Sequence, residues 1–168
     1  MSTDDDSVQV EIGVAYRNIP DRAPRPVDIG RDTLERQIQA GMFPGKPVLE
    51  DHKLDKRIGQ VLDAWIAPTR SAGHVLMVEY EIDRRTARGR EIGDKVRQGV
   101  LPHVSLGHDM DNGEVRELSV VDEGYRPGTQ TMRLPRETGQ MRPRNTQDKR
   151  MFYASKAEAL ALLAQDGT

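Results

Sequence analysis

Alternating apolar and polar residues predict several short β-strands between residues 8 and 121. The first alternation, VQVEIGVAYR at 8–17, is typical of a strand with one buried face. Two further stretches, IGQVLDAWI at 58–66 and HVLMVEYEI at 74–82, are separated by the turn sequence PTRSAG. They predict a pair of neighbouring strands.

A second pair of strands flanks Asn112-Gly113, in the sequences PHVSLGHDM and EVRELSVV. Asn-Gly between alternating strands is the strongest short hairpin signal, because a type I′ turn needs two residues at positive φ. The overlapping sequence DMDNGE, at 109–114, superficially resembles a calcium-binding loop. Its glycine arrives one residue too early, and Val120 stands where such a loop needs a bidentate glutamate. The hairpin is therefore the better interpretation.

Two helices are predicted among these strands. In DTLERQIQAGM, at 32–42, Asp32 is placed to cap a helix and Gly41 to end it. GREIGDKVRQG, at 89–99, has apolar residues four apart and Gly99 as its stop. Many short strands with few helices favour a mainly β, α+β fold. We expect a closed antiparallel β-barrel of about six to seven strands with helices packed outside.

The sequence changes character near residue 130. We expect one domain at 1–130, followed by a flexible basic segment at 131–154 that is rich in Arg, Gln, Thr and Pro. The last stretch, 155–168, opens with Ser155 and Glu158, which match a capping box. It predicts a C-terminal helix that belongs to the same domain or to an interface.

Composition narrows the protein class. A chain of 168 residues can bury the core of one domain, and a net charge of −2 does not favour binding to nucleic acid over the whole chain. The absence of cysteine excludes a disulfide scaffold, a cysteine nucleophile and thiolate metal sites. The acidic start, MSTDDDSVQV, is no secretion signal, and no apolar run approaches the ~20 residues of a membrane span. A soluble intracellular protein is expected.

Candidate chemistry centres on one histidine and one serine. His52 follows an apolar pair and two acidic residues, a context that suits a solvated loop residue, a metal ligand or a general base. His74 begins a strand and needs no special role. His103 and His108 are five apart and would lie on opposite faces of a strand, so no metal site is predicted. Ser105, in PHVSLGH, is unremarkable by itself.

Three segments together resemble the herpesvirus capsid maturation protease family, the assemblins, over roughly residues 44–129. The first is the proline-led strand that runs into Asp51 and His52. The second is VSLGH, which resembles the family's Val-Ser-Leu segment around the nucleophile. The third is ELSVVDEGYRPGT, which resembles an apolar strand followed by Gly-Arg-Arg-x-Gly-Thr. The positions that align in this third segment are Gly124, Arg126, Gly128 and Thr129.

The resemblance implies roles for five residues. His52 would be the general base and Ser105 the nucleophile. The backbone N–H of Tyr125 would serve the oxyanion hole, and the Arg126 guanidinium would support it through water. Glu117 stands where the family has a second histidine, and a carboxylate can equally fix the imidazole tautomer. Tailed-phage prohead proteases, which resemble the same family, also combine serine and histidine with an acidic third member.

The function implied is a serine endopeptidase that cleaves the internal scaffold protein during procapsid assembly. The expected partners are the scaffold or assembly protein, the capsid shell proteins and a second copy of the chain. No cofactor, metal or membrane is expected, and nucleic acid is not an expected partner. The protein would act inside the immature capsid, in the host nucleus for a herpesvirus or the host cytoplasm for a phage.

Two alternatives stay open. One is a phage-type prohead protease. The other is a catalytically inactive structural protein of the capsid or scaffold, whose basic tail contacts nucleic acid.

The sequence MFYASKAEAL also resembles the family's release site, with Tyr153, Ala154 and Ser155. Because a packed helix resists cleavage, a docked C-terminal helix is the favoured interpretation of this stretch.

Overall fold

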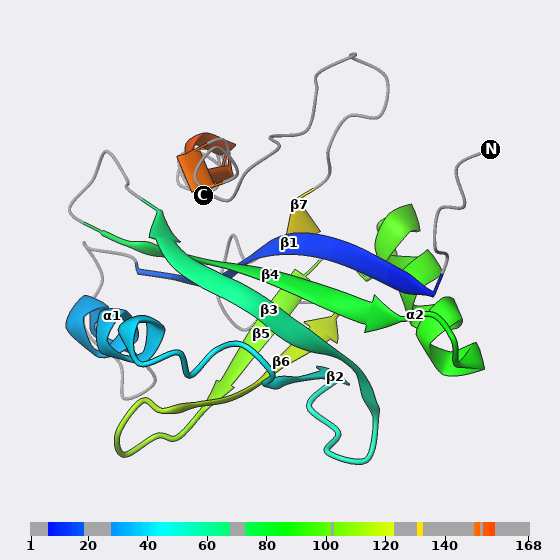
Figure 1. The fold of residues 1–168 in the computed structure, drawn as a ribbon, viewed down its shortest axis with the longest axis horizontal. Helices are drawn as coiled ribbons and strands as arrows, with labels where there is room; N and C mark the ends of the chain where they lie inside the picture. The colour runs from blue at the N-terminus through cyan, green and yellow to red at the C-terminus, as the bar shows by residue number, and fades with distance from the viewer. Residues whose placement is uncertain are drawn as a thin grey trace.

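Seven strands form a single sheet in the order β5-β6-β2-β3-β4-β1-β7 (Figure 1). The computed structural model describes residues 7–18, 28–67, 73–101, 103–122, 131–132, 150–151 and 153–156. The strands are β1 (Val8–Arg17), β2 (Pro47–Glu50), β3 (Arg57–Ala67), β4 (Val75–Asp83), β5 (His103–His108), β6 (Val115–Val121) and β7 (Thr131–Met132). The mainly β class predicted from the alternation is confirmed.

The sheet curls but stays open, so the predicted closed barrel is wrong. In Figure 1, β5 and β6 cross beneath β3 and β4 instead of running alongside them. Residues of β1 and β5 approach one another across the curl. The edge of β1, however, pairs with β7 at Ile12 and Gly13. A barrel closes only when its last edge pairs with its first, and no ladder between β5 and β1 exists in the described part of the chain.

The sheet is also not entirely antiparallel, because β2 and β6 run parallel. Val48 lies opposite Leu118, and Glu50 lies opposite Val120. The other neighbouring strands are antiparallel, including the β5–β6 hairpin. The parallel pair brings the end of β2 to the middle of that hairpin.

The first helix, α1 (Arg31–Gln39), begins earlier than predicted. Gly30 occupies its N-cap in an extended conformation, and no side chain caps the helix there. Asp32 lies inside the first turn, so its predicted role as the cap is wrong. A carboxylate in the first turn still suits the helix dipole. Gly41 has φ +68, which fits its predicted role as the residue that ends the helix.

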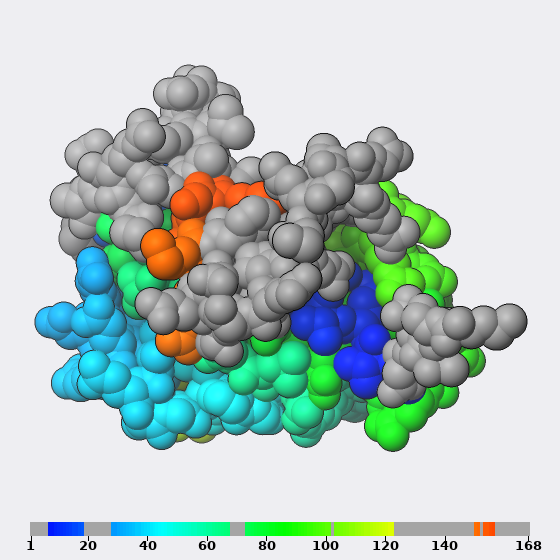
Figure 2. Space-filling view, turned by 45° about the horizontal axis from the view of Figure 1, so that its top comes forward, coloured from blue at the N-terminus to red at the C-terminus, as the bar shows by residue number. Residues whose placement is uncertain are grey.

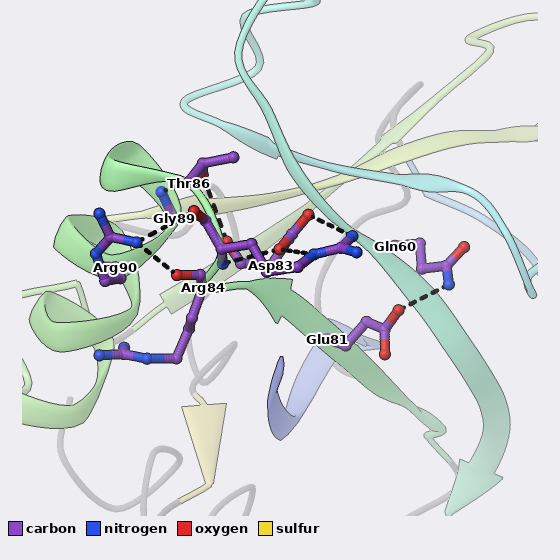
Figure 3. Close-up of polar contacts among 8 residues, drawn as sticks. Gln60, Glu81, Asp83, Arg84, Thr86, Gly89 and Arg90 are labelled. Atoms are coloured by element: carbon purple, nitrogen blue, oxygen red, sulfur yellow. Dashed lines mark hydrogen bonds and ion pairs between the residues drawn. The ribbon is translucent and has the colours of Figure 1, made fainter. Parts of the chain in front are cut away.

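The second helix, α2 (Ala87–Gln98), agrees with the prediction and ends at Gly99, which is left-handed with φ 79. Its cap is Thr86, whose hydroxyl accepts a hydrogen bond from the backbone N–H of Gly89 at 3.0 Å (Figure 3). A Cβ atom at Gly89 would lie 1.7 Å from the carbonyl oxygen of Asp83, so glycine permits the close approach of helix and strand. Figure 1 shows α1 and α2 at opposite ends of the sheet.

The β5–β6 connection is not the predicted type I′ turn. Gly113 has positive φ, at 72, but Asn112 does not. The carboxylate of Asp109 instead accepts hydrogen bonds from the backbone N–H groups of Asp111, at 2.8 Å, and Asn112, at 3.2 Å. Gly113 donates its N–H to the carbonyl of Asp109. A side-chain acceptor therefore organises a longer loop, which the Asn-Gly pair alone does not predict.

Two hydrophobic clusters lie on the two faces of the sheet. The larger lies inside the curl, where Leu34 of α1 and Ile92 of α2 join residues of the strands. The smaller joins Trp65 and Met77 of the outer face to Tyr153 and Ala154. Figure 2 shows residues 150–151 and 153–156 in orange at the surface, between α1 and β1.

The first half of β1 does not bury the face that its alternation predicts. Val8 and Val10 are 39% and 45% exposed, while Gln9 is buried. The amide of Gln9 donates to the carbonyl of Gly93 at 3.0 Å and accepts from Arg84 at 2.8 Å. Those bonds satisfy a buried polar side chain where an apolar one was expected. The last six residues of β1 are buried, because they lie between the two clusters.

The predicted flexible segment at 131–154 lies mostly outside the described residues. Residues 150–151 and 153–156 are helical, so this helix is already formed before Ser155. Ser155 donates its hydroxyl to the carbonyl of Met151 within the helix, at 3.2 Å, and its predicted capping role is therefore wrong. Among the described residues, no helix combines the length and apolar character that a membrane span requires.

Candidate active site

A sharp turn at the end of β2 carries His52 away from the sheet. After Glu50, both Asp51 and His52 have left-handed backbones, with φ 50 and 59. Such angles are uncommon for residues other than glycine, and they persist only where the surroundings hold them. Here β6 accepts two consecutive backbone hydrogen bonds: Asp51 donates to the carbonyl of Val120 at 3.3 Å, and His52 donates to the hydroxyl of Ser119 at 2.8 Å.

The turn brings together the three side chains, of His52, Ser105 and Glu117, for which the resemblance implied a triad. The Nε2 atom of His52 lies 3.0 Å from the Oγ of Ser105. On its other side, the Nδ1 atom hydrogen-bonds to the Oε1 of Glu117. Ser105 and Glu117 are 8% and 6% exposed, while the His52 side chain is 44% exposed. The histidine therefore links two buried groups, the carboxylate of Glu117 and the hydroxyl of Ser105, while its own side chain stays partly exposed.

The register of the β5–β6 hairpin explains how the serine and glutamate share a face. Ser105 lies directly opposite Ser119, and Gly107 lies opposite Glu117. Residues two apart on a strand point to the same side, so these four positions form one patch. A Cβ atom at Gly107 would lie 2.1 Å from the Oε1 of Glu117. Only glycine leaves room for the carboxylate to reach across β5 to His52.

The surroundings of His52 favour its charged form. The hydrogen bond to Glu117 raises the pKa of His52 above its ordinary value, and the negative charges of Glu117 and Asp51 act in the same direction. Partial burial opposes these effects but does not reverse them. In the neutral ring, the proton on Nδ1 is donated to the carboxylate, which leaves the Nε2 lone pair facing the hydroxyl of Ser105. The group can therefore take a proton from that hydroxyl.

An ion pair joins the start of this turn to α2. The Nε of Arg88 donates to the Oε2 of Glu50 at 2.8 Å, and the same guanidinium bonds to Glu91 of the helix. The hydrogen bond from Arg88 is the main cause of the lowered pKa of Glu50. Two residues before His52, the chain is thus tied to a packed helix.

The sequence analysis missed two members of this patch, Gly107 and Ser119. Their signal is present in the period-two patterns S-x-G and E-x-S, which place small residues beside the named ones. Tyr125 and Arg126, assigned by resemblance to the oxyanion site, lie outside the described residues.

The other three histidines are not part of the hydrogen-bonded chain from Glu117 to Ser105. His74 is buried and stacks on Tyr16, with ring centroids 5.5 Å apart. His103 and His108 lie on β5, and the Nδ1 atom of His108 lies 3.1 Å from the backbone carbonyl oxygen of Asp109. No cluster of three or more acidic or histidine side chains that could hold a metal occurs in the described part of the chain.

The overall structure resembles solved herpesvirus proteases. No protein-family model and no curated protein sequence matches the chain. The structure of varicella-zoster virus protease matches with a TM-score of 0.55 at 14% identity, over 95% of this chain and 87% of that one. The KSHV protease, in complex with a hexapeptide phosphonate inhibitor, matches with a TM-score of 0.50 at 12% identity, over 73% of this chain. The chain spans 63% of that protease. The protein has the herpesvirus protease fold.

Proposed function

We propose that the protein is a serine endopeptidase with a Ser105-His52-Glu117 triad. The observation that carries this proposal is the continuous chain of hydrogen bonds from Glu117 through the imidazole of His52 to the hydroxyl of Ser105. Its arrangement on a fold shared with proteases makes a coincidental grouping of the three side chains the weaker explanation.

The chemistry follows from the geometry. Ser105 attacks the carbonyl carbon of the scissile peptide bond as His52 takes the hydroxyl proton at Nε2. Glu117 holds the ring by Nδ1 and stabilises the imidazolium that forms. The imidazolium then gives its proton to the leaving amine, and a water molecule, activated by the same histidine, releases the acyl group. Tyr125 and Arg126 are proposed to stabilise the oxyanion.

The position of β5 in the sheet suits a peptide substrate. Within the described residues, β5 is an end strand with β6 as its ladder partner. The backbone groups on its other edge can pair with an extended peptide, which is a common mode of peptide recognition. Because Ser105 lies in the middle of β5, such a peptide would pass beside the hydroxyl.

For the biological role, we propose cleavage of the internal scaffold protein inside the immature capsid. The resemblance of the motifs and the shared fold support this role, with capsid shell proteins and a second copy of the chain as partners. The proposed place of action remains the host nucleus for a herpesvirus and the host cytoplasm for a phage.

A phage-type prohead protease is the second candidate, and the acidic third member, Glu117, is the observation that favours it. The two candidates differ in the virus and share the chemistry. A purified scaffold protein from each type of virus would distinguish them, because only the cognate scaffold should be cut.

Covalent labelling tests the enzyme proposal directly. A fluorophosphonate probe should add to Ser105 of the wild-type protein, as found by intact mass and peptide mapping, and should not add to Ser105→Ala. His52→Ala should fold and label far more slowly, because the nucleophile loses its base. No labelling of the folded wild-type protein would favour the inactive structural protein. DNA binding that weakens with salt would further support that alternative.

A further inference from the structure

Ser119 lies behind the candidate triad and contacts both the backbone of His52 and the carboxylate of Glu117. Its hydroxyl accepts a hydrogen bond from the backbone N–H of His52 at 2.8 Å and donates one to the Oε2 of Glu117 at 2.7 Å. The residue is fully buried, at 0% exposure, so water cannot replace either bond readily. The Ser119 side chain therefore links the backbone of His52 to the carboxylate of Glu117, which the imidazole binds.

The direction of these bonds is determined by the groups involved. A backbone N–H can only donate, so the hydroxyl must accept from His52. A hydroxyl has a single proton, and that proton is then committed to Glu117. Because Oε2 is occupied in this way, Oε1 is the carboxylate oxygen that faces Nδ1 of the imidazole. Ser119 thus stops rotation of the carboxylate.

The second bond restrains the backbone of the histidine. His52 has a left-handed conformation, which needs support from its surroundings. The parallel pairing of β2 with β6 ends at Glu50 and Val120, so His52 has left the ladder. The hydroxyl of Ser119 supplies an acceptor at the point where the ladder has stopped.

We propose that Ser119 is a positioning residue that fixes the imidazole of His52, because it holds both the backbone of His52 and the carboxylate that the imidazole binds. This inference rests on the proposed function. A serine or threonine is required at this position because the same atom must accept from an amide and donate to a carboxylate. Ser119 does not touch the substrate, so its loss should lower kcat and leave KM nearly unchanged.

The decisive comparison is Ser119→Thr against Ser119→Val. Both substitutions add similar volume to a strand, but only threonine keeps the hydroxyl. We expect the threonine variant to stay close to wild type. We expect the valine variant to lose on the order of 10²-fold in kcat, the loss that a misplacement of about 1 Å can cause. Equal activity in the two variants would overturn the proposal.

A spectroscopic readout separates this inference from the proposed function. The proton between Nδ1 of His52 and Glu117 should give a resonance far downfield of the amide region in the proton NMR spectrum. We expect that resonance in wild type and Ser119→Thr, and its loss or displacement in Ser119→Val, whether or not the protein cleaves peptides. An unchanged resonance in Ser119→Val would refute the positioning role. Absence of labelling in wild type would instead refute the enzyme proposal.

Two further variants guard against general loss of structure. If the added methyl groups unfold both β-branched variants, Ser119→Ala replaces them, with wild type as its partner. Gln9→Ala is the matched control, because it also removes a buried side chain whose hydrogen bonds, to Glu11, Gly93 and Arg84, lie outside the candidate triad. The proposal predicts that Gln9→Ala keeps the downfield resonance while Ser119→Ala loses it. Equal loss in both variants would show that Ser119 acts only through stability.

Discussion

Gly107→Ala should disable the proposed triad while leaving the fold intact. The new Cβ atom would lie 2.1 Å from the Oε1 of Glu117 and 2.6 Å from its Cδ. Ordinary van der Waals contact begins at 3.4 Å, so the carboxylate must retreat by about 1.3 Å, the difference between these two distances. That oxygen is the one bonded to Nδ1 of His52. The substitution therefore breaks the bond that orients the imidazole.

The expected loss in kcat/KM lies between two limits. A misplacement of about 1 Å can cost on the order of 10²-fold. Complete loss of the orienting carboxylate's function in a serine protease costs about 10⁴-fold. These limits correspond to roughly 2.7 to 5.4 kcal/mol of transition-state stabilisation, at about 1.36 kcal/mol per factor of ten. Stability should change little, because alanine is favoured over glycine within a strand by about 0.5–1 kcal/mol, which offsets part of the cost of moving the side chain.

The assay is steady-state hydrolysis of a scaffold-derived peptide, with the rate of fluorophosphonate labelling as a second measure. Gly30→Ala is the matched control, since the nearest atom to a Cβ at that position lies 4.0 Å away and the backbone φ is −66. The control should retain wild-type activity. If Gly107→Ala folds and keeps kcat/KM within a few-fold of wild type, the carboxylate of Glu117 does not orient the base.

Four other outcomes are expected. Ser105→Ala and His52→Ala should each remove most peptide hydrolysis, because nucleophile and base act as one unit; near-wild-type turnover would exclude that residue. Glu117→Gln should move the acid limb of the kcat/KM profile to lower pH, since a neutral amide supports the imidazolium of His52 less than the Glu117 carboxylate, whose hydrogen bond and charge raise the pKa of His52. The stability that the raised pKa contributes should be complete below about pH 6.5 and disappear as pH rises through the folded-state pKa; pH-independent differences in denaturation would contradict this. Leu34→Ala, at a fully buried position, should cost about 2–5 kcal/mol in denaturant unfolding, and a much smaller loss would argue against its place in the core. Intact mass after long incubation should show one uncut chain, because Ala154 is 7% exposed within a helix; a species ending at Ala154 in wild type but absent in Ser105→Ala would show self-cleavage.

Local patterns predicted the elements well where one rule dominated. The apolar spacing of Ile92 and Val96, together with Gly99, predicted α2 to within two residues at its start. Alternation predicted β3 and β4, whose ladder the structure shows. These signals succeed because side-chain direction repeats every 3.6 residues in a helix and every two in a strand. Alternation failed at Gln9, because its hydrogen bonds to a distant helix decide which face is buried.

The three side chains of the candidate triad could be named from the sequence, but the way in which they come together could not. Resemblance named His52, Ser105 and Glu117, and the structure places them in hydrogen-bond contact. Their proposed roles in catalysis stay predictions. Gly107 and Ser119 were not singled out, because a glycine and a serine on strands have many ordinary explanations.

By itself, the sequence determined the mainly β class, most element positions and the three residues proposed for the triad, since these follow from near-neighbour patterns and short motifs. Only the tertiary structure decided that the sheet stays open, that β2 meets β6 in parallel, and that His52 turns left-handed out of the ladder. Those features depend on register and on hydrogen bonds between residues far apart in the chain. The bond from His52 to Ser119 spans 67 positions, and its formation depends on how the strands pair and curl, which no local pattern records.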